Sequence, residues 1–281
     1  MNVPDLAEKN AASSCHWQGE PVTTTVGAPA LTRDGSIPPE VVAFAVFGPK
    51  GHGPTMGANR NAILLRTAGT VLLTVDDDTI CEPRTVPGAA FSGRLRIGNE
   101  TNPSAFWFFP TREAALRFTR TVDVDVAGAH EALLGWPVST LIDPATGGVA
   151  VDLDGACVHV LRGIWSGKAR VAITLNGVVG DSGMYSSGNL RLIADPGSRA
   201  RMLASAATYN CALTSRELLR QAEAATVCHP GPLMGGCVGL DNRLLLPPFF
   251  PAYRAYWASD LELEIADIEH SVVREEYASP P

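Results

Sequence analysis

The first regular pattern of apolar positions in the chain covers residues 41–75. Residues 41–47 (VVAFAVF) form an apolar run of strand length that is followed by a Gly-Pro pair, which predicts a strand. Residues 58–67 repeat apolar positions at helical spacing, and Gly69 follows where a helix would end. Residues 71–75 (VLLTV) are continuously apolar apart from one threonine, which predicts a strand that is covered on both faces.

The middle of the chain predicts a mixture of helices and strands. Thr111 has the side chain of a helix N-cap and precedes Glu113, so a helix is expected from there to about residue 120. A second helix is expected at 124–134, before Gly135. The other expected elements are a loop at 79–110, strands at 149–154, 157–161 and 171–175, and helices at 196–209 and 215–225.

The end of the chain has a different character, because residues 259–277 are rich in acidic side chains. Leu261, Ile265, Ile268 and Val272 recur at helical spacing there, which predicts an amphipathic helix. The expected organisation is therefore an α/β domain with a mixed sheet flanked by helices, preceded by an irregular segment and followed by this helix. The three parts cover residues 1–40, 41–257 and 258–281.

Composition excludes several classes of partner. The chain has 281 residues, 46% of them hydrophobic, and a formal net charge of -7. A negative balance disfavours nucleic acid and anionic membranes, since binding to either needs clustered Lys and Arg. No run of 18 apolar residues predicts a membrane span, and the first residues do not have the pattern of a signal peptide. With six scattered cysteines, reduced thiols and a cytoplasmic location are expected.

The apolar run at 71–75 ends on three consecutive carboxylates, Asp76, Asp77 and Asp78. These charges repel one another, and burying one of them without compensation costs several kcal/mol. In a mostly parallel α/β sheet, ligands gather at the carboxyl ends of strands. Mg²⁺ and Mn²⁺ prefer carboxylate oxygens and keep coordination sites for phosphate and water. Two interpretations stay open from these residues alone: a metal and phosphate site, or a solvated strand end.

The order of motifs around this strand resembles inverting glycosyltransferases of the GT-A (family 2-like) type that use nucleotide sugars. Gly57, the pair Arg60 and Asn61, a helix of small residues, Gly69, an apolar strand and Asp76-x-Asp78 follow in the order of that family. The resemblance covers about residues 41–80. Two later stretches, GDSGM at 180–184 and GLDNRLLLPPFFP at 239–251, are similar to segments of bacterial glycosyltransferase-like proteins.

The resemblance implies a GT-A-like α/β fold and transfer of a sugar from a nucleotide-diphosphate sugar to an unknown acceptor. It also implies a Mn²⁺ or Mg²⁺ cofactor. Arg60 would reach phosphate or form a salt bridge between helix and strand, and Asn61 would cap a turn or bind the donor. Asp260 is the candidate general base. The implied metal ligands are Asp76 and Asp78, and the implied nucleotide-sugar contacts are Arg60, Asn61, Asp76, Asp78 and Asp181.

Two departures from the family pattern support an alternative. Only 75 residues precede Asp76, and the first 40 are irregular, so the nucleotide-binding half would be incomplete at its N-terminal side. The stretch PAYRAYWASD at 251–260 has apolar and aromatic residues where the related proteins would carry acidic ones. The alternative is therefore a non-catalytic glycosyltransferase-like protein, or a gene fragment, that acts as a binding module.

Overall fold

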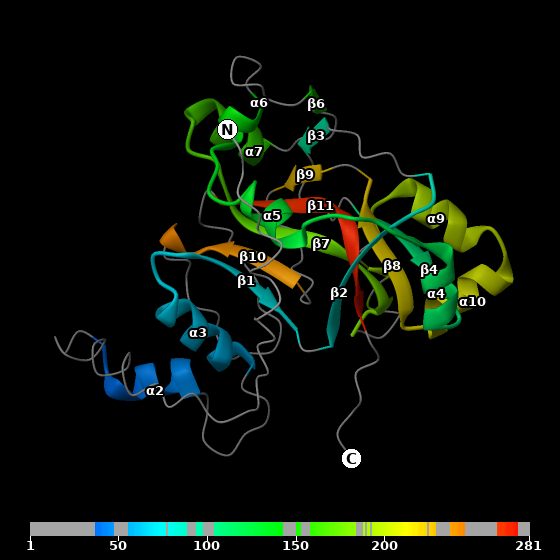
Figure 1. Ribbon diagram of the computed structural model, residues 1–281, viewed down its shortest axis with the longest axis horizontal. Coiled ribbons are helices and arrows are strands. Elements are labelled where there is room, and N and C mark those ends of the chain that lie inside the picture. The colour runs from blue at the N-terminus through cyan, green and yellow to red at the C-terminus, as the bar shows by residue number, and fades with distance from the viewer. Residues whose placement is uncertain are drawn as a thin grey trace.

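Figure 1 shows a computed structural model of the protein. The described residues are 37–47, 56–76, 78–88, 94–97, 104–142, 150–152, 158–183, 188, 190–191, 193–223, 225–228, 237–244 and 263–274.

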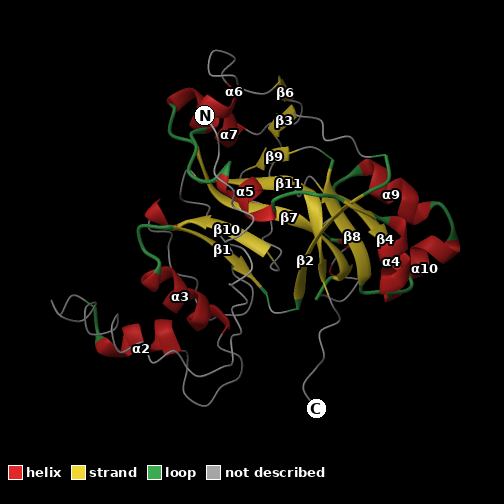
Figure 2. Ribbon diagram, viewed as in Figure 1, coloured by secondary structure: helices red, strands yellow, loops and turns green. Residues whose placement is uncertain are grey.

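These residues form a mixed α/β fold, with helices arranged around a large sheet (Figure 2). The strands are β1 (Val71–Val75), β2 (Thr79–Thr85), β3 (Arg94–Ile97), β4 (Ser104–Phe108), β5 (Arg120–Thr121), β6 (Ala150–Asp152), β7 (Arg170–Asp181), β8 (Glu217–Ala222), β9 (Ala225–Cys228), β10 (Cys237–Asp241) and β11 (Leu263–Arg274). The helices are α2 (Pro39–Phe47), α3 (Met56–Arg66), α4 (Arg112–Phe118), α5 (Val126–Glu131), α6 (Val138–Ile142), α7 (Val158–Ser166), α9 (Pro196–Leu203), α10 (Ala206–Thr214) and the 3-10 turn η3 (Asn242–Leu244).

Two 12-residue strands, β7 and β11, run parallel to each other through the middle of the sheet. β7 pairs with β10 along residues 173–175 and with β8 along 178–181. β11 pairs with β9 along residues 265–267 and with β2 along 271–274. Each of the two long strands therefore pairs with one shorter strand near its beginning and with another near its end.

The outer strands extend the sheet on both sides of this pair. β1 is antiparallel to β10, and β4 is antiparallel to β8. β3 joins β9 and β6 in parallel, and β5 pairs with β2. Along the path β4-β8-β7-β10-β1 every neighbour is antiparallel. Antiparallel pairing therefore dominates around β1, where the sequence predicts the acidic site.

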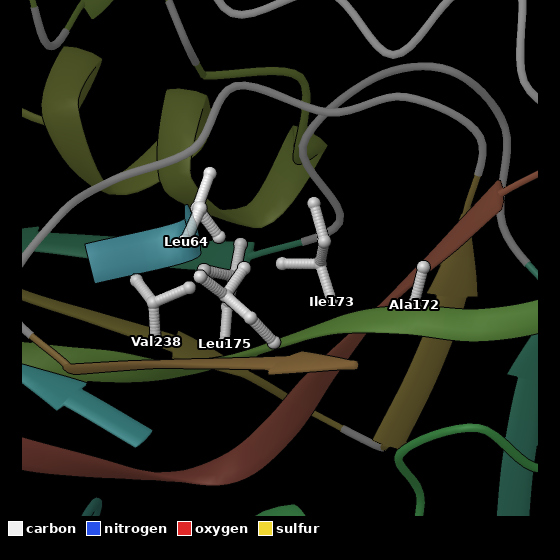
Figure 3. Close-up of a cluster of buried hydrophobic side chains, with 6 residues drawn as sticks. Leu64, Ala172, Ile173, Leu175 and Val238 are labelled. Carbon is white, nitrogen blue, oxygen red and sulfur yellow. The ribbon is translucent and has the colours of Figure 1, made fainter. Parts of the chain in front are cut away.

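The core lies against β7, whose residues 171–181 are all buried. Leu64 of α3 packs against Leu175 of β7 and Val238 of β10, and Leu72 of β1 packs against the same cluster (Figure 3). Full burial of one such leucine stabilises the folded chain by about 1.5–3 kcal/mol relative to exposure. This packing fixes α3 on one face of the sheet next to β1.

The expected strand at 41–47 is wrong, because these residues form helix α2. Pro39 occupies the start of the helix, where its missing N–H group costs no intrahelical bond, and Glu40 lies in the first turn. Val42 and Val46 are buried one turn apart. A short apolar run fits a strand and a buried helix equally well, and here the helix-start signals decide between them.

The helix expected at 215–225 is also wrong. Residues 217–222 form β8, and Ser215 is the C-cap of α10 instead of an N-cap. The helix expected at 196–209 exists but is divided into α9 and α10, because Ser205 starts a new helix with a capping box to Thr208.

Three other expectations are wrong, two of them because distant parts of the chain pair as strands. Residues 263–274 form strand β11 in the middle of the sheet instead of an amphipathic helix. Residues 158–166, part of which were expected as a strand, form helix α7. The expected loop at 79–110 contains β2, β3 and β4. Whether a segment forms a strand depends on the strands it pairs with, and the spacing of apolar residues within the segment does not identify these partners.

Local signals near the ends of helices are confirmed. α3 and β1 lie where they were expected, and Thr111 caps α4 by accepting the backbone N–H of Ala114. β1 differs from its expectation in one respect: its residues alternate between exposed and half-buried, so one of its faces is open to solvent.

Candidate functional site

The acidic end of β1 forms a tight turn into β2. The backbone N–H of Thr79 donates to the carbonyl oxygen of Asp76 at 3.1 Å, so Asp76 and Asp78 belong to the same four-residue turn. Both side chains are half-buried. Asp77 lies outside the described residues. The two carboxylates expected to bind a metal are therefore close in the chain and at the same corner of the sheet.

The connection from α3 into β1 is held by Asn242. Its side-chain Nδ2 donates to the carbonyl oxygen of Leu64 at 2.6 Å, and its own carbonyl accepts the N–H of Gly69 at 3.1 Å. Gly69 has φ of +84°, the left-handed region that glycine adopts without a steric penalty. The helix, the glycine and the strand named by the sequence thus form one unit that is attached to η3.

The next candidate residues are the pair Arg60 and Asn61 in α3. Arg60 belongs to α3, but its side chain lies outside the described residues. Asn61 is 1% exposed, and its Nδ2 donates to the carbonyl oxygen of Ala45 at 2.7 Å. Asn61 therefore fastens α2 to α3, which gives this side chain a structural role in packing.

Asp181 lies at the end of β7 and is 2% exposed. Its carboxylate accepts the Nε–H of Arg216 at 2.9 Å and the N–H of Gly183 at 2.8 Å, and its second oxygen lies 2.9 Å from Nη2 of Arg216. Both carboxylate oxygens are therefore engaged within the chain. Asp260, the expected general base, lies outside the described residues.

A buried polar cluster that the sequence did not reveal lies under α5, around His130. The Nδ1 atom of this imidazole is 2.7 Å from Oγ1 of Thr174, and Nε2 is 3.1 Å from Oδ1 of Asn176 and 3.7 Å from Sγ of Cys237. His130 is 1% exposed. The histidine thereby ties α5 to β7 and β10, and we refer to these four side chains as the His130 cluster.

The partners of His130 determine its tautomer. Nδ2 of Asn176 donates to the carbonyl oxygen of Gly177, which turns Oδ1 of Asn176 towards the imidazole. An oxygen acceptor requires a hydrogen on Nε2, so Nδ1 of the neutral ring accepts from the hydroxyl of Thr174. In this arrangement His130 is not the base that would take a proton from the thiol of Cys237.

Arg220 extends the cluster across the sheet. This residue of β8 is 1% exposed, and its guanidinium donates from Nη1 to Oγ of Ser104 at 2.7 Å and from Nη2 to the carbonyl oxygen of Asn176. A buried guanidinium needs such hydrogen bonds, because removing its charge from water is costly. The polar contacts therefore run continuously from β4 through β8 and β7 to α5.

Cys237 connects this cluster to the acidic turn. It lies directly opposite Val75, the last residue of β1, in the β1–β10 register. Burial, with smaller effects from the neighbouring Cys81 and Asp76, raises the pKa of its thiol to about 12. The thiol is therefore protonated at neutral pH and is a poor nucleophile.

The donor set at the turn fits a hard cation in part. Carboxylate oxygens are the ligands that Mg²⁺ and Mn²⁺ prefer, and such ions take most of their remaining ligands from phosphate and water. Within the described ranges, no three His, Cys, Asp or Glu side chains are arranged to hold a metal ion by themselves. Asp76 and Asp78 would thus hold a cation together with a bound ligand.

Reasoning from the sequence missed the His130 cluster because its members belong to no motif. One signal was present: Thr174 and Asn176 are polar residues at alternate positions of an otherwise apolar strand, so their side chains share one buried face. Buried polar side chains require partners.

No helix among the described residues is long and apolar enough to span a membrane. Comparison with known proteins gave no match to any family model, any curated protein or any solved structure.

Proposed function

We propose that the chain is a glycosyltransferase-like protein with a GT-A-type core, which binds a nucleotide-diphosphate sugar and a divalent cation at the turn between β1 and β2. The observation that carries the proposal is the α3–Gly69–β1–Asp76 unit. Its helix, left-handed glycine, strand and acidic turn follow one another as the resemblance of the sequence requires.

The proposed chemistry assigns roles to this chain's own residues. Asp76 and Asp78 would hold a Mn²⁺ or Mg²⁺ ion, and the half-buried position of both carboxylates would strengthen their attraction for it. The bound cation would supply Lewis-acid stabilisation of the leaving diphosphate. Arg60 is assigned to phosphate, and Asp260 to activation of the acceptor hydroxyl in an inverting transfer.

One observation favours a second candidate, a protein of the same ancestry that binds a ligand without catalysis. The described residues before β1 form the helices α2 and α3, and none of them adds a strand to the sheet beside β1. Asn61 and Asp181 are also engaged in contacts within the chain.

Calorimetric titration with UDP and with GDP, each in the presence and absence of Mn²⁺, tests the shared part of both candidates. We expect binding that depends on Mn²⁺. Asp78→Asn removes one charge with little change in shape and should weaken the metal-dependent binding at least about tenfold, which corresponds to about 1.4 kcal/mol. Asp123→Asn, at an exposed position elsewhere, is the matched control and should bind as the wild type does.

The two candidates differ in turnover. A glycosyltransferase should transfer the sugar of a bound donor slowly to water and faster to an acceptor, and each transfer releases free nucleotide diphosphate. The binding protein should release none. A folded chain that binds neither nucleotide with Mn²⁺ present would overturn both candidates. Equal affinity of the Asp78→Asn variant and the wild type would show that the acidic turn is not the site.

A further inference from the structure

Exposed apolar side chains gather at the end of the sheet that carries β1, α2 and α3. The exposed large hydrophobic residues in these elements are Val41 and Phe44 of α2, Leu65 of α3, and Val71, Leu73 and Val75 of β1. The three β1 side chains are 36%, 37% and 49% exposed, respectively. Figure 1 shows α3 below β1, with α2 beside α3. Exposed apolar side chains that lie together on one face mark interaction sites in globular proteins, and β1 carries three of them.

The three exposed residues of β1 form a single stripe, which we call the β1 stripe. Leu73 lies opposite Gly239 and Val75 opposite Cys237, so the stripe is on the face of the sheet that carries α5 and the His130 cluster. Leu72, between them in the chain, points to the opposite face and packs with Leu64. The stripe is therefore the outer continuation of a buried face.

β1 also lies at an edge of the described sheet. Its strand partner is β10 on one side, and no other strand in the described ranges pairs with it. Natural edge strands usually carry a charged residue, a proline or a bulge that prevents pairing with another chain. The sequence VLLTV has no charge and no proline, and the β1–β10 register is continuous over all five residues. This edge is therefore suited to accept a further strand.

A second copy of β1 fits this edge by its own sequence. In an antiparallel pair with a two-fold axis at Leu73, Leu73 faces Leu73 of the second copy, and Val71 faces Val75 of the second copy. Side chains at directly opposite positions lie on the same face. The two β1 stripes then form one apolar surface of six side chains, and an isologous contact of this kind closes after two copies.

The charges at the two ends of β1 select the antiparallel direction. Arg66 is exposed in the last turn of α3, before the strand, and Asp76 and Asp78 follow the strand. Antiparallel pairing brings the end with Arg66 of one copy to the acidic end of the other, twice. Parallel pairing would bring the acidic turns together, and like charges at close range repel.

We propose that β1 is the contact strand of a homodimer, in which two sheets join edge to edge in antiparallel register through Leu73. The contact is short, because one five-residue strand buries less surface than the roughly 800 Å² per partner of a stable complex. The dimer is therefore concentration-dependent. The proposal does not depend on the proposed function, since its test measures the oligomeric state of the chain and not nucleotide binding.

Sedimentation equilibrium of the full chain over a hundredfold range of concentration tests the proposal. The wild type should shift from monomer to dimer. Leu73→Lys places two ammonium groups opposite each other and should raise the dissociation constant at least about tenfold. Leu203→Lys is the matched control, because Leu203 is 63% exposed on α9, and it should associate as the wild type does.

A charge exchange tests the direction of the strands without changing the strand. Arg66→Glu should weaken the dimer, and adding Asp76→Lys to it should restore association, because opposite charges face each other again. Circular dichroism establishes that each variant is folded. A wild type that remains monomeric at the highest concentration overturns the proposal, as does a folded Leu73→Lys variant that dimerises as tightly as the wild type. Failure of the charge exchange to restore association overturns the antiparallel register.

Discussion

Nε2 of His130 lies 3.1 Å from Oδ1 of Asn176, and this contact joins the short helix α5 to the middle of the long central strand β7. Asn176 in turn accepts a hydrogen bond from Arg220 through its backbone carbonyl. One asparagine therefore links a histidine of helix α5 to an arginine of the neighbouring strand β8. Several consequences for stability can be measured.

His130→Ala should destabilise the fold by about 2–4 kcal/mol, because it removes a buried ring and leaves the polar atoms of Thr174 and Asn176 without that partner. Urea denaturation followed by circular dichroism measures the loss. Glu131→Ala, at the exposed neighbouring position of the same helix, should change the free energy of unfolding by less than about 0.5 kcal/mol. Equal effects of the two substitutions would contradict the structural role of the ring.

Arg220→Lys should also destabilise the protein even though the charge is kept. The guanidinium reaches Ser104 and Asn176 with two nitrogen atoms at once, and a single ammonium group does not reproduce that fork. The expected loss is about 1–3 kcal/mol by chemical denaturation. Arg191→Lys, at an exposed position, is the control and should leave the denaturation midpoint in place.

The pKa of Cys237, raised to about 12 mainly by burial, predicts a stability that depends on pH. An unfolded cysteine loses its proton near pH 9, whereas the folded thiol keeps it, so the folded state binds more protons between pH 9 and about 12. Its contribution is complete below pH 9 and is lost as the pH rises towards 12.

Denaturation midpoints measured from pH 8 to pH 10.5 test this dependence. The free energy of unfolding of the wild type should fall by about 1 kcal/mol more per pH unit above pH 9 than that of the Cys237→Ala variant. A thiol reagent at pH 8 should modify the exposed Cys81 quickly and Cys237 only on unfolding. Rapid modification of both thiols in the folded protein would contradict the burial of Cys237.

Two glycines should respond differently to alanine. A Cβ atom at Gly239 would collide with Oγ1 of Thr174 and come within 2.9 Å of Leu134 and 3.1 Å of His130. At Gly69 the same atom would meet nothing within 4 Å, but the backbone there has a φ of +84°. We expect Gly69→Ala to cost about 1–2 kcal/mol from conformation alone. Gly239→Ala should cost more, up to about 3 kcal/mol, and reduce the thermal midpoint further.

The correct predictions from the sequence rest on signals that lie close together along the chain. Gly69 follows α3 with a left-handed backbone, Thr111 caps α4 through the N–H of Ala114, and the apolar run after Gly69 forms β1, although its partner β10 is distant in sequence. The acidic turn also lies where the spacing placed it. In the region of the candidate site, the helix, the strand and the position of Asp76 could therefore be predicted, whereas the partners of these elements could not.

The errors come from pairing between distant segments. Residues 263–274 carry apolar side chains at helical spacing, but they lie in parallel beside β7, and β2 and β9 pair with their other edge. Nothing within the segment reports those neighbours. The same holds for His130, whose partners on β7 and β10 lie more than 40 residues away in the chain.

The place of β11 in the sheet has a consequence for how the chain folds. β7 and β11 are separated by most of the C-terminal third of the sequence, yet they form the middle of the sheet. During synthesis from the N-terminus, β7 leaves the ribosome long before its parallel neighbour, and until then one of its edges has no permanent partner. Pairing over such a sequence separation is slow because the intervening chain must first be closed into a loop. The pairing of β7 with β11 at the centre of the sheet therefore forms last. Until then, the exposed edge of β7 is the place where a nascent chain would need protection.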